Sequence, residues 1–187
     1  PSVDGPPPPA LAKVRLTTPS DAPSLRRFSC STGPWYEREV EELVRGMLAD
    51  HVEQGFAAWV IEDEFGELAA VAAHVGQTHP ENSDETITYI ALIAARADDR
   101  DDRAAGWRLR QLIKAVFTDI LHTVGRGPYV YQMVAVENSR MRTFLEWSGF
   151  QAAPVPSDSR YLYYSTRVSA SGRPLDEIYT VPEERRP

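Results

Sequence analysis

The sequence predicts an α/β fold in which a mixed, mostly antiparallel central sheet is flanked by helices. Residues 86–95 (TITYIALIAA) form a nearly continuous apolar run, which is typical of a strand buried on both faces. From residue 107 onward the apolar side chains recur at helical spacing, which predicts a long amphipathic helix directly after that strand. Alternating runs at residues 13–18 and 160–168 predict strands near both ends of the domain. The predicted order is β-α-α-β-β-β-α-β-α-β.

The first third of this order has two helices. Residues 19–28 predict a short helix that begins at Ser20 or Asp21 and turns Leu25 and Phe28 inward. Residues 35–54 predict a longer helix that Gly55 ends. Its inner face at helical spacing is made of apolar residues, namely Val40, Leu43, Val44, Met47, Leu48 and Val52.

The middle and last thirds contain the remaining strands. Residues 56–76 predict a β-hairpin with its turn near Phe65 and Gly66, and a polar loop separates it from the central strand. Residues 129–136 predict another strand. A short helix is then predicted to begin at Asn138 or Ser139 and to end at Gly149, because glycine is a common helix stop. The final predicted strand follows this helix.

Composition sets the domain organisation. The chain has 187 residues, of which 42% are hydrophobic and 25% charged, so one globular domain is expected. We place it at residues 13–168. Residues 1–12 (PSVDGPPPPALA) contain four consecutive prolines and predict a disordered lead. Residues 169–187 lack a clear period and predict a tail, which either lies on the surface or pairs with a second copy in a homodimer.

Charge and cysteine content restrict partners and location. The 27 acidic and 20 basic residues give a net charge of -7, which argues against a nucleic-acid partner. The single cysteine, Cys30, excludes an intramolecular disulfide and fits a cytoplasmic location. No apolar run approaches the roughly 20 residues of a membrane span. The four histidines share no spacing that predicts a metal site.

The segment VAVENSRMRTFLEWSGF, residues 134–150, resembles the strand-to-helix segment of the GCN5-related N-acetyltransferases, the GNAT family. Positions that match the family pattern are Asn138, Phe144, Glu146, Gly149 and Phe150. Residues 14–28 (VRLTTPSDAPSLRRF) resemble the opening strand and helix of the family, and the element order agrees across residues 13–168. The resemblance implies an acetyl-CoA-dependent transfer of an acetyl group to an amine.

The family's pyrophosphate loop lies between the central strand and the long helix. The matching residues here are Arg103, Ala104, Ala105, Gly106, Trp107 and Arg108. A helix start offers unsatisfied N–H groups and a partial positive charge, which together suit a pyrophosphate. Arg108 stands where the family has glycine or alanine, and a solvated turn is the alternative reading of this segment.

The resemblance also implies contacts for the rest of the cofactor. In the family, the central strand offers a backbone amide to the thioester, and Leu92, Ile93 and Ala94 match that stretch. The side chain of Asn138 matches the position that contacts the pantetheine arm.

The catalytic groups depart from the family pattern. The position that usually carries a tyrosine acid is Leu145, and leucine cannot donate a proton. The candidates for acid–base work are Glu137, Tyr89 and His74, although a histidine on a half-buried strand is more often structural. Trp35 and Tyr36 match the region that lines the acceptor site, and they could stack on a substrate.

We therefore expect an N-acetyltransferase that acts on a primary amine of a small molecule, a peptide or an aminoacyl group. A toxin that acetylates aminoacyl-tRNA is a variant of this interpretation, against which the acidic charge argues. The alternative is a catalytically silent GNAT-like module that binds a ligand or a partner, which Leu145 favours.

Overall fold

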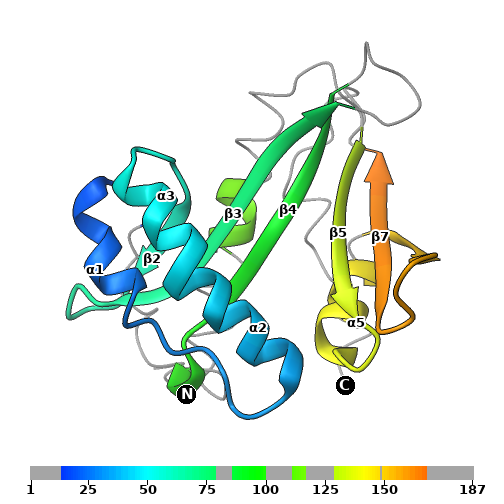
Figure 1. Cartoon of the computed structure of the whole chain (residues 1–187), viewed down its shortest axis with the longest axis horizontal. Helices are drawn as coiled ribbons and strands as arrows, with labels where there is room; N and C mark the ends of the chain where they lie inside the picture. Colours follow the sequence, from blue (N-terminus) through cyan, green and yellow to red (C-terminus); the bar gives the residue numbers. More distant parts are fainter. Residues whose placement is uncertain (1–13, 79–85, 100–110, 117–128, 148, 168–187) are drawn as a thin grey trace, which may run out of the picture. The chain divides into compact units, whose positions relative to one another are not determined.

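The computed structural model describes residues 14–78, 86–99, 111–116, 129–147 and 149–167. Its seven strands form one sheet in the order β1-β2-β3-β4-β5-β7-β6 (Figure 1). The strands are β1 (Val14–Leu16), β2 (Trp59–Glu62), β3 (Leu68–Thr78), β4 (Thr86–Ala95), β5 (Tyr129–Ala135), β6 (Gln151–Pro154) and β7 (Tyr161–Arg167). The pairs β1–β2, β2–β3, β5–β7 and β6–β7 are antiparallel, and β4–β5 is parallel. The predicted α/β class with a mostly antiparallel sheet is confirmed.

The helices lie between these strands in the predicted places. They are the 3-10 turn η1 (Pro19–Asp21), α1 (Ala22–Leu25), α2 (Trp35–Leu43), the π-helical segment η2 (Val44–Leu48), α3 (Ala49–Glu53), the 3-10 turn η3 (Ala97–Asp99), a helical stretch at 111–116, and α5 (Ser139–Trp147). The first helix, α1, begins directly after Asp21, one of the two predicted capping positions. A 3-10 turn precedes α1 and is capped by Thr18, whose N–H donates to the Asp21 carboxylate at 2.7 Å.

The chain divides into two compact units. The first contains Pro1–Ala72 and Ile93–Ala115, and the second contains Ala73–Leu92 and Val116–Pro187. Both β3 and β4 run through both units.

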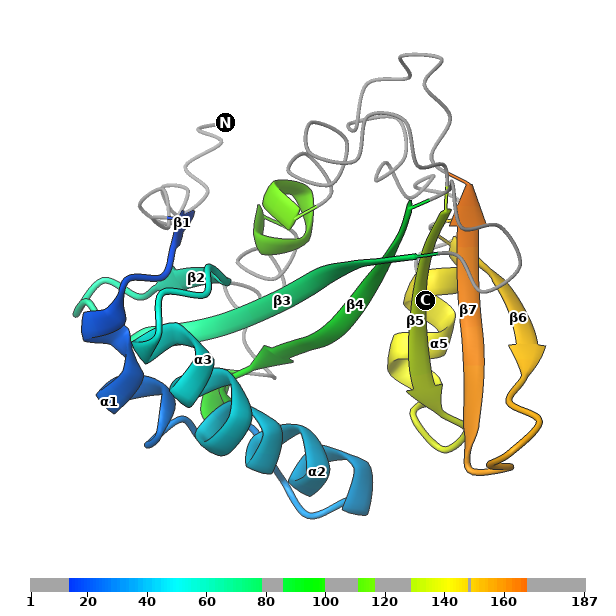
Figure 2. The ribbon, with the colours of Figure 1, turned by 45° about the horizontal axis from the view of Figure 1, so that its top comes forward.

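The first unit has a core between its helices and the strands β1 to β3. Leu25 of α1 and Val44 and Val52 of the long helix are fully buried, as are Val60 and Val71 on the paired strands. Figure 2 shows α1 and α3 on one side of β3 and the helical stretch at 111–116 on the other side. The sheet of this unit is therefore covered on both faces, which its continuous apolar strands require.

The second unit packs α5 on one face of β5 and β7. The Asn138 Oδ1 accepts the Met141 N–H at 3.1 Å and so caps α5. Gly149 ends the helix with a φ of 84°, a left-handed conformation that favours glycine. The strand that follows, β6, is an edge strand that the sequence does not predict.

Candidate functional site

Parallel pairing between β4 and β5 covers only the first part of both strands. The registered pairs are Ile87↔Tyr129, Thr88↔Val130 and Tyr89↔Tyr131, where Figure 1 shows the two strands side by side. The other edge of β5 remains paired with β7 along the full strand, as far as Ala135↔Tyr161. In the part of the chain that the structure describes, β5 therefore continues past Tyr131 without a further registered partner on β4.

A cluster of tyrosines lies where this pairing ends. The Tyr89 ring stacks on the Tyr131 ring with centroids 4.8 Å apart, and the Tyr163 ring meets Tyr131 edge-on at 6.0 Å. The Tyr131 hydroxyl donates a hydrogen bond to the Gln77 Oε1 at 2.6 Å, which fixes the ring. We call Tyr89, Tyr131 and Tyr163 the tyrosine cluster.

The environment favours the uncharged form of Tyr89 and Tyr131. Burial raises the pKa of Tyr89 above 10.0, and the neighbouring Tyr163 raises it further. Burial, together with Tyr89 and Tyr163, also raises the pKa of Tyr131. At neutral pH these phenols are therefore protonated hydrogen-bond donors and weak bases.

Two buried polar side chains lie on the opposite face at the same level. Thr88 is fully buried and Gln132 is 6% exposed. Thr88 pairs with Val130, two residues before Gln132, so both side chains point to one face from adjacent strands. The Thr88 Oγ1 and the Gln132 Oε1 have no hydrogen-bond partner within the described ranges. Because an unsatisfied buried polar atom costs about 1–3 kcal/mol, such atoms usually meet water or a ligand.

The helix α5 borders the same face through hydrogen bonds to the buried Tyr164. The Tyr164 hydroxyl donates to the Glu146 Oε1 at 2.8 Å and accepts from the Arg142 Nε at 3.2 Å. Leu145, on the same helix, is only 1% exposed. The position that carries the usual acid in the family is therefore part of the core in this chain.

The three predicted acid–base residues lie at different places in the second unit. Tyr89 belongs to the tyrosine cluster. His74 is three residues before Gln77 on β3, so strand alternation places it on the opposite face from Gln77. Glu137 is exposed in the turn after β5. The structure does not bring His74 and Tyr89 together on one face.

The predicted cofactor residues are partly within the described ranges. On β4, Leu92 and Ala94 are buried and Ile93 is half-buried. The Asn138 Oδ1 caps α5, so its Nδ2 is the part of the side chain that remains to meet a ligand. The predicted pyrophosphate loop, Arg103, Ala104, Ala105, Gly106, Trp107 and Arg108, lies outside the described residues.

The predicted acceptor residues begin α2 in the first unit. The rings of Trp35 and Tyr36 are half-buried and meet edge-on at 5.7 Å. The loop before them is held by Glu41, whose carboxylate accepts the N–H groups of Cys30 at 2.8 Å and Ser31 at 3.0 Å. Burial opposes ionisation of Glu41, but these hydrogen bonds outweigh it and lower its pKa. This carboxylate is therefore committed to holding the loop.

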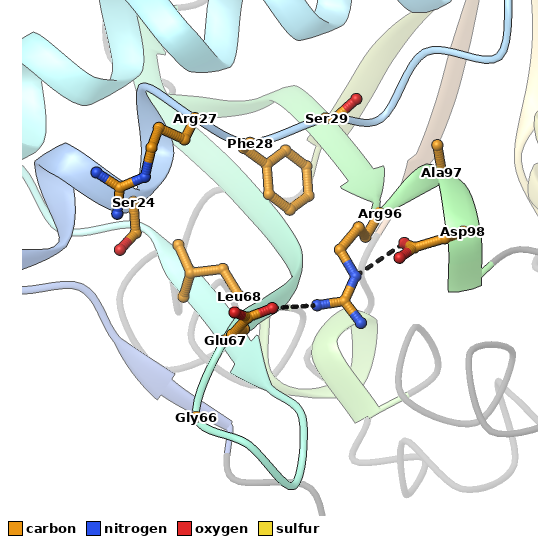
Figure 3. A pocket seen from close by; sticks show the side chains of 10 residues that line it. All are labelled: Ser24, Arg27, Phe28, Ser29, Gly66, Glu67, Leu68, Arg96, Ala97 and Asp98. Carbon is orange, nitrogen blue, oxygen red and sulfur yellow. Dashed lines mark hydrogen bonds and ion pairs between the residues drawn. The ribbon is translucent and has the colours of Figure 1, made fainter.

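A separate cavity of about 480 Å³ lies in the first unit, beside the turn between β2 and β3 (Figure 3). Phe28 and Leu68 supply its apolar wall, and Arg96 crosses its rim. The Arg96 guanidinium donates to Asp63 at 2.9 Å and to Asp98 at 2.8 Å, so its charge is already balanced. The Arg96 guanidinium is therefore already committed to these carboxylates and is not available to pair with an anionic ligand in this cavity.

Other site types find no support in the part of the chain that is described. Among those residues, no group of three or more histidine, cysteine, aspartate or glutamate side chains could hold a metal ion. No described helix is both long and apolar enough to cross a membrane.

Sequence reasoning missed several residues of this site, namely Gln77, Thr88, Tyr131 and Gln132. A polar residue inside an otherwise apolar strand is the signal that could have identified Thr88 and Gln132. The tyrosine cluster depends on the register between β4 and β5, which the sequence alone does not reveal.

Comparisons with known proteins bear on the fold. No model of a protein family matches the chain, and no curated protein matches it. Solved structures do match. A protein from Desulfovibrio desulfuricans assigned to the GNAT family has a TM-score of 0.59 at 22% identity, covering 84% of this chain and 99% of that one. The ribosomal-protein-S18-alanine N-acetyltransferase of Escherichia coli has a TM-score of 0.57 at 15% identity, covering 87% and 97%.

A third similar structure contains the expected co-substrate. AtaTR bound with acetyl-CoA has a TM-score of 0.57 at 14% identity, covering 83% of this chain and 93% of that one. Likeness at these identities establishes the architecture alone. The chain therefore has the fold of the GCN5-related N-acetyltransferases.

Proposed function

We propose that this protein is an acetyl-CoA-dependent N-acetyltransferase that acts on a primary amine. The observation that carries the proposal is the end of the parallel β4–β5 pairing at Tyr89↔Tyr131, with the unsatisfied Thr88 and Gln132 side chains beside it. Similar structures support it, since one is an N-acetyltransferase and another is bound with acetyl-CoA.

The residues beside the end of this pairing fit the pantetheine arm of acetyl-CoA. That arm carries amide groups, which can satisfy a buried hydroxyl and a buried amide oxygen at once. Thr88, Gln132 and the Nδ2 of Asn138 would hold the arm. Residues 92–94 remain the candidates to bind the thioester through their backbone. Residues 103–108 would bind the pyrophosphate at the helix start. When bound, acetyl-CoA supplies the activated acetyl group.

Proton handling falls to residues of this chain. The Tyr89 Oη carries a proton at neutral pH, and burial favours its protonated form further by raising its pKa, so it is a candidate for the donor that the family normally places at the position of Leu145. Glu137 is a candidate base, because its exposed carboxylate can accept a proton through water. His74 is the alternative base, and it lies on the face of β3 that is opposite to Gln77.

The acceptor is a primary amine of a small molecule, a peptide or an aminoacyl group. Trp35 and Tyr36, the first two residues of α2, remain candidates to contact it. We place the protein in the cytoplasm, where its single buried cysteine remains reduced. Residues 169–187 are the candidate segment for contact with a second copy.

Thr88→Val tests the cofactor site, because it should increase the stability of the free protein but decrease its affinity for acetyl-CoA. Valine has nearly the shape of threonine and removes a hydroxyl that is unsatisfied without ligand, so the free protein should become more stable, by on the order of 1 kcal/mol. If Thr88 binds acetyl-CoA, the same change should weaken its affinity about tenfold. Unfolding in urea measures the stability, and isothermal titration calorimetry measures the affinity.

Thr143→Val is the matched control, because Thr143 is exposed on α5 and should change neither quantity. Gly106→Trp should abolish binding by filling the predicted pyrophosphate loop. If the wild-type protein shows no heat of binding with acetyl-CoA, the proposal is wrong.

The second candidate function is a catalytically silent GNAT-like binding module. Burial of Leu145 favours it, since the usual acid is replaced by a core residue. Acetyl-CoA binding without release of free thiol over a panel of primary amines would select this function instead.

A further inference from the structure

We propose that the acceptor is a small monoamine in which one ammonium group is attached to an aromatic body, and that the tyrosine cluster binds it. This inference rests on the proposed N-acetyltransferase function and assigns its substrate class. Three observations carry it: the placement of the rings, the charge of the surrounding sheet face and the geometry of a neighbouring cation on tyrosine.

The tyrosine cluster lies at the end of the β4–β5 pairing. Tyr89 is the last β4 residue in register with β5, and its partner there is Tyr131. Met133 is the next residue of β5 on the same face, and it pairs with Tyr163 of β7. Three adjacent strands therefore present tyrosine rings on one face, at the level of the unsatisfied Thr88 and Gln132 on the opposite face. An amine on these rings would lie at the end of the β4–β5 pairing, where the proposed function places acetyl-CoA.

The rings offer a fixed aromatic surface. Tyr89 and Tyr131 stack with an interplanar angle of 28°, so each covers one face of the other. Tyr163 stands at 71° to Tyr131 and presents its ring edge. The hydrogen bond from Tyr131 to Gln77 holds the central ring in this position. Such a surface suits offset stacking of a ligand ring and contact of an ammonium with a ring face.

The surrounding sheet face carries no acidic residue at the described strand positions of this unit. Strand register and alternation give its members as Ala73, Val75, Gln77, Ile87, Tyr89, Ala91, Tyr129, Tyr131, Met133, Ala135, Gln151, Ala153, Tyr161, Tyr163, Ser165 and Arg167. Among these, the basic residue Arg167 stands at the end of β7, where it pairs with Tyr129. A polyamine with several ammonium groups needs several carboxylates or carbonyl oxygens to compensate its charge. A single ammonium needs less, and ring quadrupoles supply part of it.

The same face already shows a cation on a tyrosine ring. The Arg160 guanidinium carbon lies 5.6 Å from the centroid of the Tyr161 ring, within the range of a cation–π contact. Tyr161 is two residues from Tyr163 along β7, so the two rings share a face. The Arg160 charge is balanced by Asp158 at 2.7 Å.

The reaction on such an amine balances without a further reagent. The ammonium first loses one proton to a base, and the nitrogen lone pair then forms a bond to the acetyl carbon. The carbon–sulfur bond breaks, and the sulfur leaves as a thiolate that takes up a proton, with the Tyr89 Oη as the nearest proposed donor. The acylated nitrogen then loses its second proton, which restores the proton of the Tyr89 Oη. The products are an N-acetylamine and the free thiol of coenzyme A.

Direct binding of four probes to the full-length chain tests the inference without acetyl-CoA. The probes are 2-phenylethylamine, 2-cyclohexylethylamine, 2-phenylethanol and spermidine, measured by calorimetry or by ligand-observed NMR. We expect 2-phenylethylamine to bind at least about tenfold more tightly than each of the others, because it alone combines one ammonium with an aromatic ring. Equal or tighter binding of spermidine would overturn the inference.

Variants then locate the bound probe. Tyr131→Leu and Tyr163→Leu should each weaken 2-phenylethylamine about tenfold, whereas Tyr131→Phe keeps the ring and should stay within about threefold. Phe65→Leu is the matched control, since Phe65 is 83% exposed in the turn of the β2–β3 hairpin. Unchanged binding in both leucine variants would overturn the inference, and circular dichroism checks that each variant is folded.

The outcomes separate this inference from the proposed function. Binding of 2-phenylethylamine that depends on Tyr131, without any binding of acetyl-CoA, supports the amine site and refutes the acetyltransferase. Turnover of other amines, without binding of 2-phenylethylamine, supports the acetyltransferase and refutes the amine site.

Discussion

At the scale of single residues, Asp21 shows how one ion pair makes stability depend on pH. Its two carboxylate oxygens each accept a hydrogen bond from Arg15 at 2.8 Å, and Arg15 also pairs with Glu62. The hydrogen bonds from Arg15 lower the pKa of Asp21 from 3.8 to about 2, although burial opposes this shift. The charged form is therefore favoured in the folded state.

We predict that Asp21→Asn reduces the acid sensitivity of the fold. Because the folded-state pKa lies below the unfolded value near 3.9, the carboxylate stabilises the fold above that value and loses its effect as pH falls from about 5 to about 2. The shift corresponds to on the order of 2 kcal/mol. Urea unfolding across this pH range should show a smaller loss of unfolding free energy in the variant than in the wild type.

Asp50→Asn is the control for this measurement. Asp50 also pairs with an arginine, Arg26, but its side chain is 61% exposed, so the pair should contribute little. Identical pH profiles for Asp21→Asn and the wild type would contradict the assignment of the acid sensitivity to Asp21.

The candidate site was predictable from the sequence only where a single residue carried the signal. Replacement of the usual tyrosine by Leu145 could be read directly, and Asn138 could be placed before its helix. Thr88 and Gln132 are polar residues in apolar strands, but their meeting depends on a register between strands more than 30 residues apart in the chain. Local patterns carry no information on such a register.

At the scale of elements, strong periodic patterns were predicted well. The central strand spans Thr86–Ala95, as its apolar run predicts. The edge strand Gln151–Pro154 was missed, because a four-residue segment with two alanines and a proline has low strand propensity. Its strand conformation comes from pairing with β7, a tertiary contact.

The long helix departs from its predicted inner face. Leu43 is 38% exposed and Met47 is 49% exposed, although helical spacing predicts both as core residues. The segment Val44–Leu48 forms π-helical bonds, which connect residues five apart and change the phase of the faces. A helical wheel drawn with a constant number of residues per turn cannot show where such a π-helical segment begins.

We predict that alanine has opposite effects on stability at two glycines, Gly46 within this long helix and Gly55 just after its end. A Cβ at Gly46 would meet no atom within 4 Å, and so would a Cβ at Gly55. Gly46 does not have the positive φ of Gly55, which is 96°. Gly46→Ala should stabilise the fold by about 0.5–1 kcal/mol, and Gly55→Ala should destabilise it by about 1–2 kcal/mol.

Thermal unfolding of both variants measures this difference. Since space is available at both positions, opposite shifts of Tm isolate the backbone conformation as the cause. Destabilisation by Gly46→Ala would show instead that the π-helical segment requires glycine.

At the scale of the whole molecule, two strands link the two compact units. The β3 strand passes from Ala72 of the first unit to Ala73 of the second, and β4 passes from Leu92 of the second unit to Ile93 of the first. If either unit unfolded, its own parts of β3 and β4 would be lost, and the parts of these strands in the other unit would be left incomplete. Strand pairing is cooperative in small domains, so the units should not unfold independently.

We therefore predict a single unfolding transition, which tryptophan probes can test unit by unit. Trp59 lies on β2 in the first unit and Trp147 at the end of α5 in the second. Two variants, each with one of these tryptophans and phenylalanine at the other three tryptophan positions, report on one unit at a time.

Far-ultraviolet circular dichroism of each variant corrects for any change in global stability. Relative to that signal, both fluorescence midpoints in urea should coincide, because loss of β3 and β4 from one unit leaves the sheet of the other incomplete. A separation of about 1 M between fluorescence and dichroism midpoints in either variant would show that one unit unfolds by itself.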